Sequence, residues 1–317
     1  MGDVLFCTEA FLERHGDELR AMAPELGTVV LRGDERVDDE DLARITIAHF
    51  SSDAWPERAA NFMAVAMGAP NLRWLHSMSA GVDHPVFQMF VDRGVRVTTS
   101  SGSSSQPIAA TVLMYLLALA RDLPRMMRAQ AQREWAWERW TELRGRQVAI
   151  LGMGPIGLEV ARLAAEFGME PTIVRRAVHG DEAWPTRTLA ELTDVVAQHD
   201  AVVVALPLTD ETRGIISADI IGAMRPGALF VNVGRGELVD QPELTAALGE
   251  GRLGGAGLDV TDPEPLPPDD PLWELPNVII TPHNSGSTDG TARRASEAFL
   301  ANLDRWRTGE PLLNEIG

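Results

Sequence analysis

The chain has 317 residues, of which 45% are hydrophobic and 23% are charged, proportions typical of a folded globular protein. This length exceeds that of most single domains, so we expect two domains. The 46 acidic residues outnumber the 28 basic ones, which are all arginines, and the formal net charge is −18. Because no basic tract interrupts this acidic background, nucleic acid is a poor candidate partner.

The N-terminus and the cysteine content favour a cytoplasmic location. The first residues lack a basic region followed by a long apolar run, so we expect no secretory signal. The longest apolar stretch, residues 107–120, is too short to cross a bilayer, so we expect no membrane association. Cys7 is the only cysteine and has no intramolecular partner for a disulfide, which fits a reducing compartment.

Short β-rich runs alternate with helical stretches over the first third of the chain. The predicted strands cover residues 4–7, 28–32, 45–50, 72–78 and 95–100, with a helix at about 9–22. A loop rich in serine and glycine begins at residue 101 and leads into the apolar helix at 107–120. Strands that alternate with helices indicate βαβ units and a parallel sheet.

A second alternation follows in the middle of the chain. Its predicted strands cover residues 147–152, 171–176, 201–207, 228–234, 255–260 and 277–283. These runs are almost continuously apolar, as strands covered on both faces require. The final helical segment, about 288–308, has no strand partner of its own, so we expect it to return to the first unit. The prediction is an α/β fold with two doubly wound, Rossmann-like parallel sheets: one domain at 1–100 plus 285–317 and a second at 101–284.

A glycine-rich turn follows the strand at 147–152 and opens a helix, which is the context of a dinucleotide-binding loop. Gly152 makes the tight turn, Gly154 lets the backbone approach a pyrophosphate, and Gly157 allows close packing of helix on strand. The N–H groups at the start of the helix then face the phosphates. We predict that the turn binds a dinucleotide through Gly152, Gly154, Pro155, Ile156 and Gly157.

The next strand ends in Arg175 and Arg176, at the place where an NAD-preferring site carries a carboxylate for the ribose hydroxyls. Guanidinium groups bind a 2′-phosphate through charge-assisted hydrogen bonds. The pair therefore predicts a preference for NADP(H), with NAD(H) as a possible cofactor. The alternative is that both side chains are solvated surface arginines.

Three loops at the carboxyl ends of predicted strands, where open α/β sheets bind their ligands, carry Arg235, Glu264 and His283. Reduction of a 2-keto acid requires a cation for the carboxylate, a proton donor for the keto oxygen and a group that keeps that donor protonated. Arg235 suits the first role because its planar fork matches a carboxylate. His283 suits the second because imidazole titrates near neutrality. Glu264 suits the third because its negative charge favours the imidazolium form.

With the motifs VNVGRGELVD (231–240), LDVTDPEPL (258–266) and ITPHNSG (280–286), the chain resembles the D-isomer-specific 2-hydroxyacid dehydrogenase family from about residue 70 to about residue 310. The resemblance implies that Arg235, Glu264 and His283 form the catalytic set. It also implies that the backbone N–H groups of Ala80 and Gly81, in the loop MSAGVD (78–83), bind the substrate carboxylate, with Arg235 and His283 as the other substrate contacts.

The same resemblance implies further cofactor contacts and an assembly. The remaining cofactor positions are Pro207, Val233, Asp259, which would contact the nicotinamide carboxamide, and Ser285. The first domain becomes the substrate-binding domain, the inserted one the dinucleotide-binding domain, and the protein a homodimer. The chain departs from the family pattern at Ala110, where the family usually has glutamate, and at Arg175, which replaces the usual ribose-binding aspartate.

Two groups of side chains leave alternatives open. Trp135, Trp137 and Trp140 crowd one stretch between the domains. One of them could reach the substrate pocket of a neighbouring subunit, as an aromatic does in glyoxylate and hydroxypyruvate reductases of the family, or all could pack at the dimer interface. The remaining histidines lack the spacing of a metal site, so no metal is expected; they are His15, His49, His76, His84, His179 and His199. Of these, His84 is close enough to the 78–83 loop to line a pocket.

The sequence thus predicts an NADP(H)-preferring reductase of small 2-keto acids to D-2-hydroxy acids, with glyoxylate and hydroxypyruvate as the leading substrates. One alternative is a dinucleotide-sensing binding protein, similar to the transcriptional corepressors that resemble these dehydrogenases. A second is a formate dehydrogenase, an activity that usually goes with glutamine at the position of Glu264.

Overall fold

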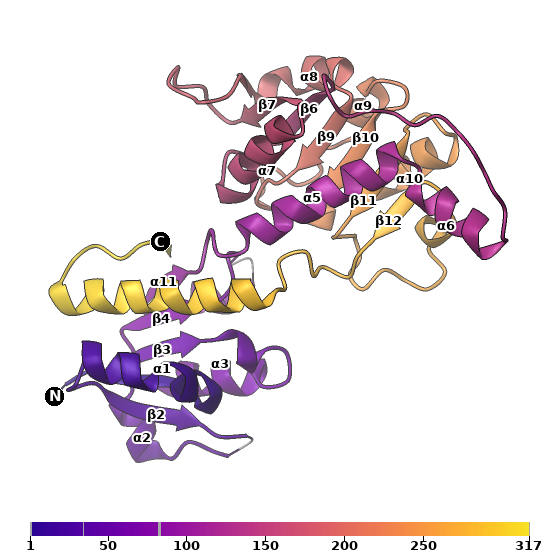
Figure 1. Ribbon diagram of the computed structural model, residues 1–317. Helices are drawn as coiled ribbons and strands as arrows, with labels where there is room; N and C mark the ends of the chain where they lie inside the picture. Colours follow the sequence, from indigo (N-terminus) through magenta and orange to yellow (C-terminus); the bar gives the residue numbers. More distant parts are fainter. Residues whose placement is uncertain (1, 34, 82–83, 317) are drawn as a thin grey trace. The chain divides into compact units, whose positions relative to one another are not determined.

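The computed structural model describes residues 2–33, 35–81 and 84–316, which fold as two compact units (Figure 1). Unit 1 comprises the chain up to Ser103 together with the segment from Thr288 onward, and unit 2 comprises Ser104–Ser287. The divisions at 103 and 287 lie close to the predicted ones at 100 and 284. Because the last segment joins the first, unit 1 is discontinuous in sequence.

Unit 1 is built on a six-stranded sheet in the order β13-β5-β4-β3-β1-β2. Its strands are β1 (Val4–Thr8), β2 (Gly27–Leu31), β3 (Ile47–Phe50), β4 (Trp74–Ser77), β5 (Arg96–Thr99) and β13 (Glu315–Ile316). The first five pair in parallel, as predicted. The edge strand β13 pairs antiparallel with β5, and two residues are too few to produce a periodic pattern in the sequence.

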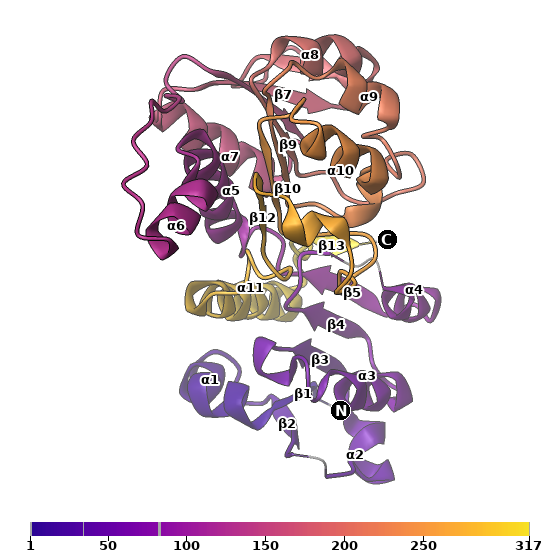
Figure 2. The same ribbon diagram turned by 90° about the vertical axis from the view of Figure 1, so that its right-hand side faces the viewer.

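Helices cover both faces of this sheet (Figure 2). On one face lie α1 (Glu9–Met22) and α11 (Asp289–Thr308), and on the other α2 (Asp39–Arg44), α3 (Ala59–Gly68) and α4 (Pro85–Asp92). On α11, the side chains of Phe299, Leu300 and Leu303 pack in one buried cluster with Leu5 and Trp74. The final helical segment therefore completes the core of the first unit, as the sequence predicts.

Two histidines are fully buried in this core. The ring of His49 stacks on that of Phe299 with centroids 4.1 Å apart, and neither ring nitrogen has a hydrogen-bond partner among the described residues. His76 places Nδ1 2.8 Å from the hydroxyl of Thr98 and Nε2 3.0 Å from that of Ser100. Burial lowers the pKa of His76 to about 3. Burial, together with the neighbouring His76, also holds the pKa of His49 well below its ordinary value.

Unit 2 is built on a seven-stranded sheet in the order β12-β11-β10-β9-β6-β7-β8, with parallel pairing throughout. Its strands are β6 (Gln147–Leu151), β7 (Glu170–Arg175), β8 (Thr186–Thr188), β9 (Ala201–Val204), β10 (Leu229–Asn232), β11 (Gly255–Leu258) and β12 (Val278–Ile280). The three-residue β8 was not predicted. The strand order reverses between β6 and β9, and doubly wound sheets bind ligands outside the carboxyl ends of the strands at such a reversal.

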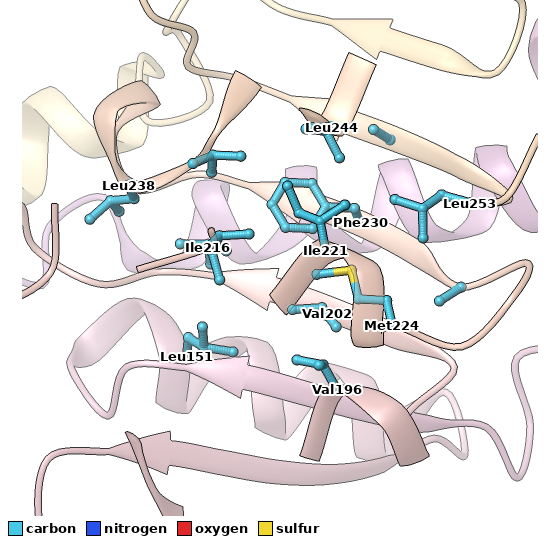
Figure 3. Close-up of a cluster of buried hydrophobic side chains, with 14 of the residues drawn as sticks. Leu151, Val196, Val202, Ile216, Ile221, Met224, Phe230, Leu238, Leu244 and Leu253 are labelled. Atoms are coloured by element: carbon cyan, nitrogen blue, oxygen red, sulfur yellow. The ribbon is translucent and has the colours of Figure 1, made fainter. Parts of the chain in front are cut away.

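The two faces of the second sheet are also covered by helices (Figure 2). One carries α5 (Ser105–Ala120) and α7 (Pro155–Glu166), with α6 (Leu123–Ala131) following α5; the other carries α8 (Leu192–Gln198), α9 (Ala218–Ala223) and α10 (Gln241–Gly249). Figure 3 shows the core on the second side, where Val202 and Phe230 of the sheet lie with Ile221 of α9, Met224 directly after α9 and Leu244 of α10. Short 3-10 turns occur at Ser52–Ala54, Leu189–Glu191, Gly236–Leu238 and Pro271–Glu274. The predicted fold class is confirmed.

Of the helices in the described parts of the chain, none by itself has the length and apolar character of a membrane span. Only α5 and α6 together have such a composition, and they are bent by 64° at the break between them. Most of the apolar side chains of α5 are buried against the sheet and α7.

Candidate active site

The glycine-rich turn connects β6 to α7 in the centre of the second sheet. Gly152 has a φ of +115°, which side-chain-bearing residues rarely adopt, and a Cβ there would lie 2.6 Å from the carbonyl oxygen of Ala205. A Cβ at Gly157 would lie 2.0 Å from the carbonyl oxygen of Gly152. The fold itself therefore requires both glycines, one for the turn and the other for the contact between helix and strand.

Gly154 differs from these two glycines. It is the N-cap of α7 with a φ of −76°, and a Cβ at this position would meet nothing within 4 Å. Neither backbone strain nor internal packing accounts for a glycine here. The open space lies before the first turn of α7, where N–H groups point out of the helix, so the turn fits the pyrophosphate of a dinucleotide.

Arg175, the last residue of β7, lies beside this turn. Its Nη1 is 3.1 Å from the sulfur of Met153, within the glycine-rich sequence, and 3.8 Å from a carboxylate oxygen of Glu182. The Glu182 carboxylate accepts the backbone N–H groups of His179 and Gly180, and those hydrogen bonds lower its pKa. The guanidinium of Arg175 is thus held over the start of the turn.

Arg176 points to another partner. Its guanidinium lies 3.2 Å from Glu211, and both side chains are about 70% exposed. An ion pair this exposed contributes little to stability. The sequence predicted a 2′-phosphate site from the pair, and the structure associates Arg175, but not Arg176, with the glycine-rich turn.

The turn that follows β10 holds Arg235. The buried side chain of Asn232 accepts a hydrogen bond from the N–H of Gly234 at 3.0 Å and donates one to the carbonyl of Arg235 at 2.8 Å. One carboxamide therefore fixes the backbone on both sides of the turn. The guanidinium of Arg235 also donates to the carbonyl of Gly234 at 2.7 Å.

Close backbone contact joins this turn to the next loop. A Cβ on Gly236 would lie 2.0 Å from the carbonyl oxygen of Thr261, so the chain after Arg235 passes directly over the loop that follows β11. That loop carries Glu264 and contains two cis peptide bonds, Asp262–Pro263 and Glu264–Pro265. The loops after β10 and β11 thus meet at the carboxyl edge of the sheet.

His283 and Glu264 form a hydrogen-bonded pair. Nδ1 of His283 lies 2.9 Å from Oε2 of Glu264, and Oε1 of Glu264 accepts the backbone N–H of Thr261 at 3.2 Å. The imidazole therefore presents Nε2 away from the carboxylate. Both side chains are partly exposed, at 47% for the histidine and 39% for the glutamate.

The backbone of His283 has a φ of +48°, in the left-handed region that costs energy for a residue with a side chain. Its N–H donates to the carbonyl oxygens of Asp259 at 2.8 Å and Thr281 at 3.0 Å. The carboxylate of Asp259 accepts the N–H groups of Asn284 and Ser285. Asp259 therefore holds the chain on both sides of the histidine.

A pocket in unit 2 opens between these loops. Its lining includes the polar residues Asp259, Glu264, Thr281 and His283, with Leu266 and Trp273 among its apolar residues. Mostly apolar pockets with a few convergent polar groups are the usual form of a small-molecule site.

The other positions implied by the family resemblance lie in both units. In unit 2, Pro207 is exposed after β9, its carbonyl accepting the hydroxyl of Thr212, while Val233 is buried. Ser285 is buried as well, and its N–H and hydroxyl both donate to Asp259.

Ala80 and Gly81 belong to unit 1, in the loop after β4, where the hydroxyl of Ser79 donates to the carbonyl of Gly81 at 2.9 Å. Val82 and Asp83, the end of the same motif, lie outside the described residues. His84 caps α4: its Nδ1 accepts the N–H of Val86 at 3.2 Å. No group of histidine, cysteine and carboxylate side chains suited to a metal occurs among the described residues.

Three polar residues at this edge of the sheet were not predicted to have a role. The side chain of Asn232 fixes the turn of Arg235 through hydrogen bonds, Thr281 hydrogen-bonds to Asp259, and Tyr115 hydrogen-bonds to Thr281. Two signals were available: Asn232 is a polar residue at the end of a fully apolar strand, and Tyr115 is the only tyrosine of the chain.

Comparison with known proteins shows which family the chain resembles. Residues 113–285 match the D-isomer specific 2-hydroxyacid dehydrogenase, NAD binding domain. The chain is 36% identical over 255 residues to a glyoxylate reductase of Korarchaeum cryptofilum, covering 76% of this chain and 75% of that protein. It is 30% identical over 315 residues to the glyoxylate reductase/hydroxypyruvate reductase of Mus musculus, covering 96% and 95% of the two chains.

A solved structure is similar over nearly the whole length. The D-isomer specific 2-hydroxyacid dehydrogenase from Xanthobacter autotrophicus Py2, determined in complex with NADPH and MES, superposes with a TM-score of 0.80 at 32% identity, covering 100% of this chain and 98% of that one. The chain belongs to the D-isomer specific 2-hydroxyacid dehydrogenase family and is an NAD(P)-dependent oxidoreductase.

Proposed function

We propose that the protein is an NADP(H)-preferring reductase that converts small 2-keto acids to D-2-hydroxy acids, with glyoxylate and hydroxypyruvate as the leading substrates. The observation that carries the proposal is the 2.9 Å hydrogen bond between His283 and Glu264, beside the loop of Arg235 at the carboxyl edge of the sheet. The printed names of the relatives, glyoxylate reductase and glyoxylate reductase/hydroxypyruvate reductase, support the substrate class.

Each of the three side chains has a role in this reaction. The planar guanidinium of Arg235 binds the substrate carboxylate and orients the keto group. When His283 is charged, Nδ1–H donates to Glu264 and Nε2–H remains to be given to the keto oxygen. Glu264 fixes the orientation of the ring through its hydrogen bond to Nδ1. The bound nicotinamide supplies the hydride to the keto carbon.

The preference for NADP(H) rests on Arg175 within this chain. The guanidinium at the end of β7 lies 3.1 Å from the sulfur of Met153 in the glycine-rich turn, and the strand itself ends in arginine where an NAD-preferring site has a carboxylate, which supports binding of a 2′-phosphate. The open space before Gly154 accommodates the pyrophosphate in the same proposal. The NADPH of the related Xanthobacter structure supports this choice of cofactor.

A panel of 2-keto acids, assayed with NADPH and with NADH by the absorbance of the reduced nicotinamide, tests the proposal. We expect turnover of glyoxylate or hydroxypyruvate, with a kcat/KM at least about tenfold higher with NADPH, a difference of about 1.4 kcal/mol in transition-state free energy. Equal values with both cofactors would overturn the NADP(H) preference. Tight dinucleotide binding without turnover of any keto acid would instead favour a dinucleotide-sensing protein.

We further infer that the protein is a homodimer in which a second copy of the chain covers the tryptophan-rich segment. Trp135 and Trp137 are 96% and 76% exposed, and Leu123 and Met127 of the preceding helix are about half exposed. Trp140 is also half exposed, and the guanidinium of Arg121 lies over its ring. Large apolar side chains gathered in this way usually mark an interface, where aromatic residues and methionine are enriched.

Light scattering measures the mass in solution. We expect the mass of two chains for the wild type and of one chain for a variant with Trp135→Ser and Trp137→Ser. Trp273→Ser, which changes a half-exposed tryptophan in another loop, is the control and should leave the mass unchanged. A monomeric wild type, or a double variant that stays dimeric, would overturn the inference.

A further inference from the structure

The loop that carries His283 is connected to Tyr115, a residue of α5 more than 160 positions earlier in the chain. The phenol oxygen of Tyr115 hydrogen-bonds to the hydroxyl of Thr281, and the Thr281 hydroxyl lies 2.5 Å from Oδ1 of Asp259. Asp259 in turn accepts the N–H groups of Asn284 and Ser285. A continuous chain of hydrogen bonds thus runs from the helix to the segment around His283.

The chemistry of the groups fixes the direction of each hydrogen bond. An ionised carboxylate only accepts, so Thr281 must donate its single hydroxyl proton to Asp259. The oxygen of Thr281 is then available to Tyr115 only as an acceptor, and the phenol donates. Burial raises the pKa of Tyr115 to about 12, so the phenol keeps this proton at neutral pH.

The ring of Tyr115 is tightly packed against the sheet. Tyr115 is fully buried, and its Cγ lies 2.3 Å from where a Cβ on Gly257 would stand. The ring therefore lies directly on the backbone of β11, two residues before Asp259. Because Thr281 donates its own N–H to the carbonyl of Leu258 at 2.9 Å, both members of the pair sit beside the same strand end.

The carboxylate of Asp259 is fully engaged by this loop. Its donors are the hydroxyl of Thr281, the hydroxyl and N–H of Ser285, and the N–H of Asn284. Four donors fill the roughly four acceptor positions of a carboxylate. The carboxylate of Asp259 therefore connects the chain after His283 to Thr281, which is the one donor of the four that is itself hydrogen-bonded to Tyr115.

We propose that Tyr115 and Thr281 are positioning residues for His283, acting through Asp259 to hold its left-handed backbone in one place. The proposal rests on the catalytic role of His283 given in the proposed function. A histidine in an unfavourable backbone conformation needs such external support, because the loop would otherwise relax toward a more favourable φ. A displacement of a proton donor by about 1 Å is enough to slow a reaction by as much as about a hundredfold.

The principal variants are Tyr115→Phe, which removes only the hydroxyl, and Thr281→Val, which keeps the shape of threonine. We expect each to lower kcat by about tenfold and to leave the KM for the keto acid within about twofold. Thr281→Ser retains the hydroxyl and should restore most of the activity. Because both residues act in one chain, the double variant should be no slower than Thr281→Val.

Thr111→Val is the matched control. Thr111 lies one turn earlier on α5 and donates its hydroxyl to the carbonyl of Pro107, within its own helix. The Thr111→Val variant should change neither kcat nor the conformation of the loop that carries His283. Multiplicative effects of Tyr115→Phe and Thr281→Val, or a Tyr115→Phe variant with wild-type kcat, would overturn the proposal.

Hydrogen exchange of the protein without cofactor gives a readout that does not need activity. We expect the N–H groups of Asn284 and Ser285 to exchange about tenfold faster in Tyr115→Phe and Thr281→Val than in the wild type or Thr111→Val. Unchanged exchange in both variants would overturn the proposal. A wild-type protein inactive with every keto acid would overturn the proposed function instead, and the exchange rates would still report whether Tyr115 holds the loop.

Discussion

A Cβ atom on Gly157 would lie 2.0 Å from the carbonyl oxygen of Gly152, whereas one on Gly154 would meet no atom within 4 Å. The three glycines of this motif therefore have different structural roles. Gly152 is required by the turn and Gly157 by the contact between helix and strand, whereas neither strain nor packing among the described residues requires a glycine at position 154.

Gly157→Ala should accordingly lower mainly the stability of the protein, whereas Gly154→Ala should weaken mainly its dinucleotide binding. We expect Gly157→Ala to lower the free energy of unfolding by about 3 kcal/mol, because backbone must move to admit the methyl group. Gly154→Ala should change it by less than about 0.5 kcal/mol but weaken dinucleotide binding at least about tenfold. Denaturant unfolding and fluorescence titration with NADPH measure the two quantities. Wild-type affinity in Gly154→Ala would argue against a pyrophosphate at this turn.

His283→Ala removes the proposed proton donor. We expect kcat to fall by a factor of about 10² to 10⁴, the usual contribution of a general acid, while NADPH binding stays within about twofold. Steady-state kinetics and a binding titration measure these effects. His15→Ala, which changes a histidine of α1 whose ring pairs with Glu18, serves as the control. Near wild-type turnover in His283→Ala would assign the acid to another group.

The two arginines at the end of β7 should contribute unequally to cofactor choice. Arg175 lies over the glycine-rich turn, while Arg176 pairs with Glu211 in solvent. We expect Arg175→Ser to weaken NADPH binding about tenfold or more and NADH binding about twofold at most, with Arg176→Ser weaker in both respects. Isothermal titration with each cofactor measures the four constants. Should both cofactors lose affinity equally, the 2′-phosphate contact would be excluded.

Acid should destabilise unit 1 through its buried histidines. In the unfolded chain a histidine takes up a proton as the pH falls below its ordinary pKa of 6.5, whereas His76 in the folded state stays neutral down to about 3. The unfolded state then binds more protons, so stability is complete above pH 6.5 and falls below it. Between these two pH values, 6.5 and about 3, His76 alone lowers the free energy of unfolding by about 1.4 kcal/mol per pH unit.

His49→Phe isolates one of these groups. We expect the free energy of unfolding to decline less steeply in this variant as the pH falls below 6.5, because one of the histidines that stay neutral in the folded state has been removed. His179→Gln, which changes an exposed histidine, should keep the wild-type slope. The slope, measured by urea unfolding, is independent of any change in stability that the larger ring causes at neutral pH. An identical slope in His49→Phe and wild type would contradict the expectation.

Local patterns were enough to predict most of the fold. The strand at 147–151 and the glycines that follow it are signalled within about ten residues, and the structure has β6 and α7 there. The strands β8 and β13 were missed because three and two residues carry no periodicity. The return of α11 to unit 1 was predicted by elimination, since its segment had no strand partner in the second unit.

The hydrogen bonds that hold the site in place could not be predicted from the sequence in the same way. Arg235, Glu264 and His283 stand in short motifs, each recognisable by itself. Tyr115 and Thr281, by contrast, are 166 positions apart, and nothing near either residue indicates that they touch. Hydrogen bonds of this kind depend on how a helix is seated on a sheet, and that is decided by packing over the whole unit.

The discontinuity of unit 1 affects the order in which the protein is made. A ribosome completes residues 104–287 before it reaches Phe299, Leu300 and Leu303, which close the core of the first unit. Unit 2 can therefore fold while the five parallel strands made before it still expose the side of their sheet that α11 will cover. Unit 1 can therefore complete its core only after α11 has been synthesised, although most of its sheet is made before unit 2.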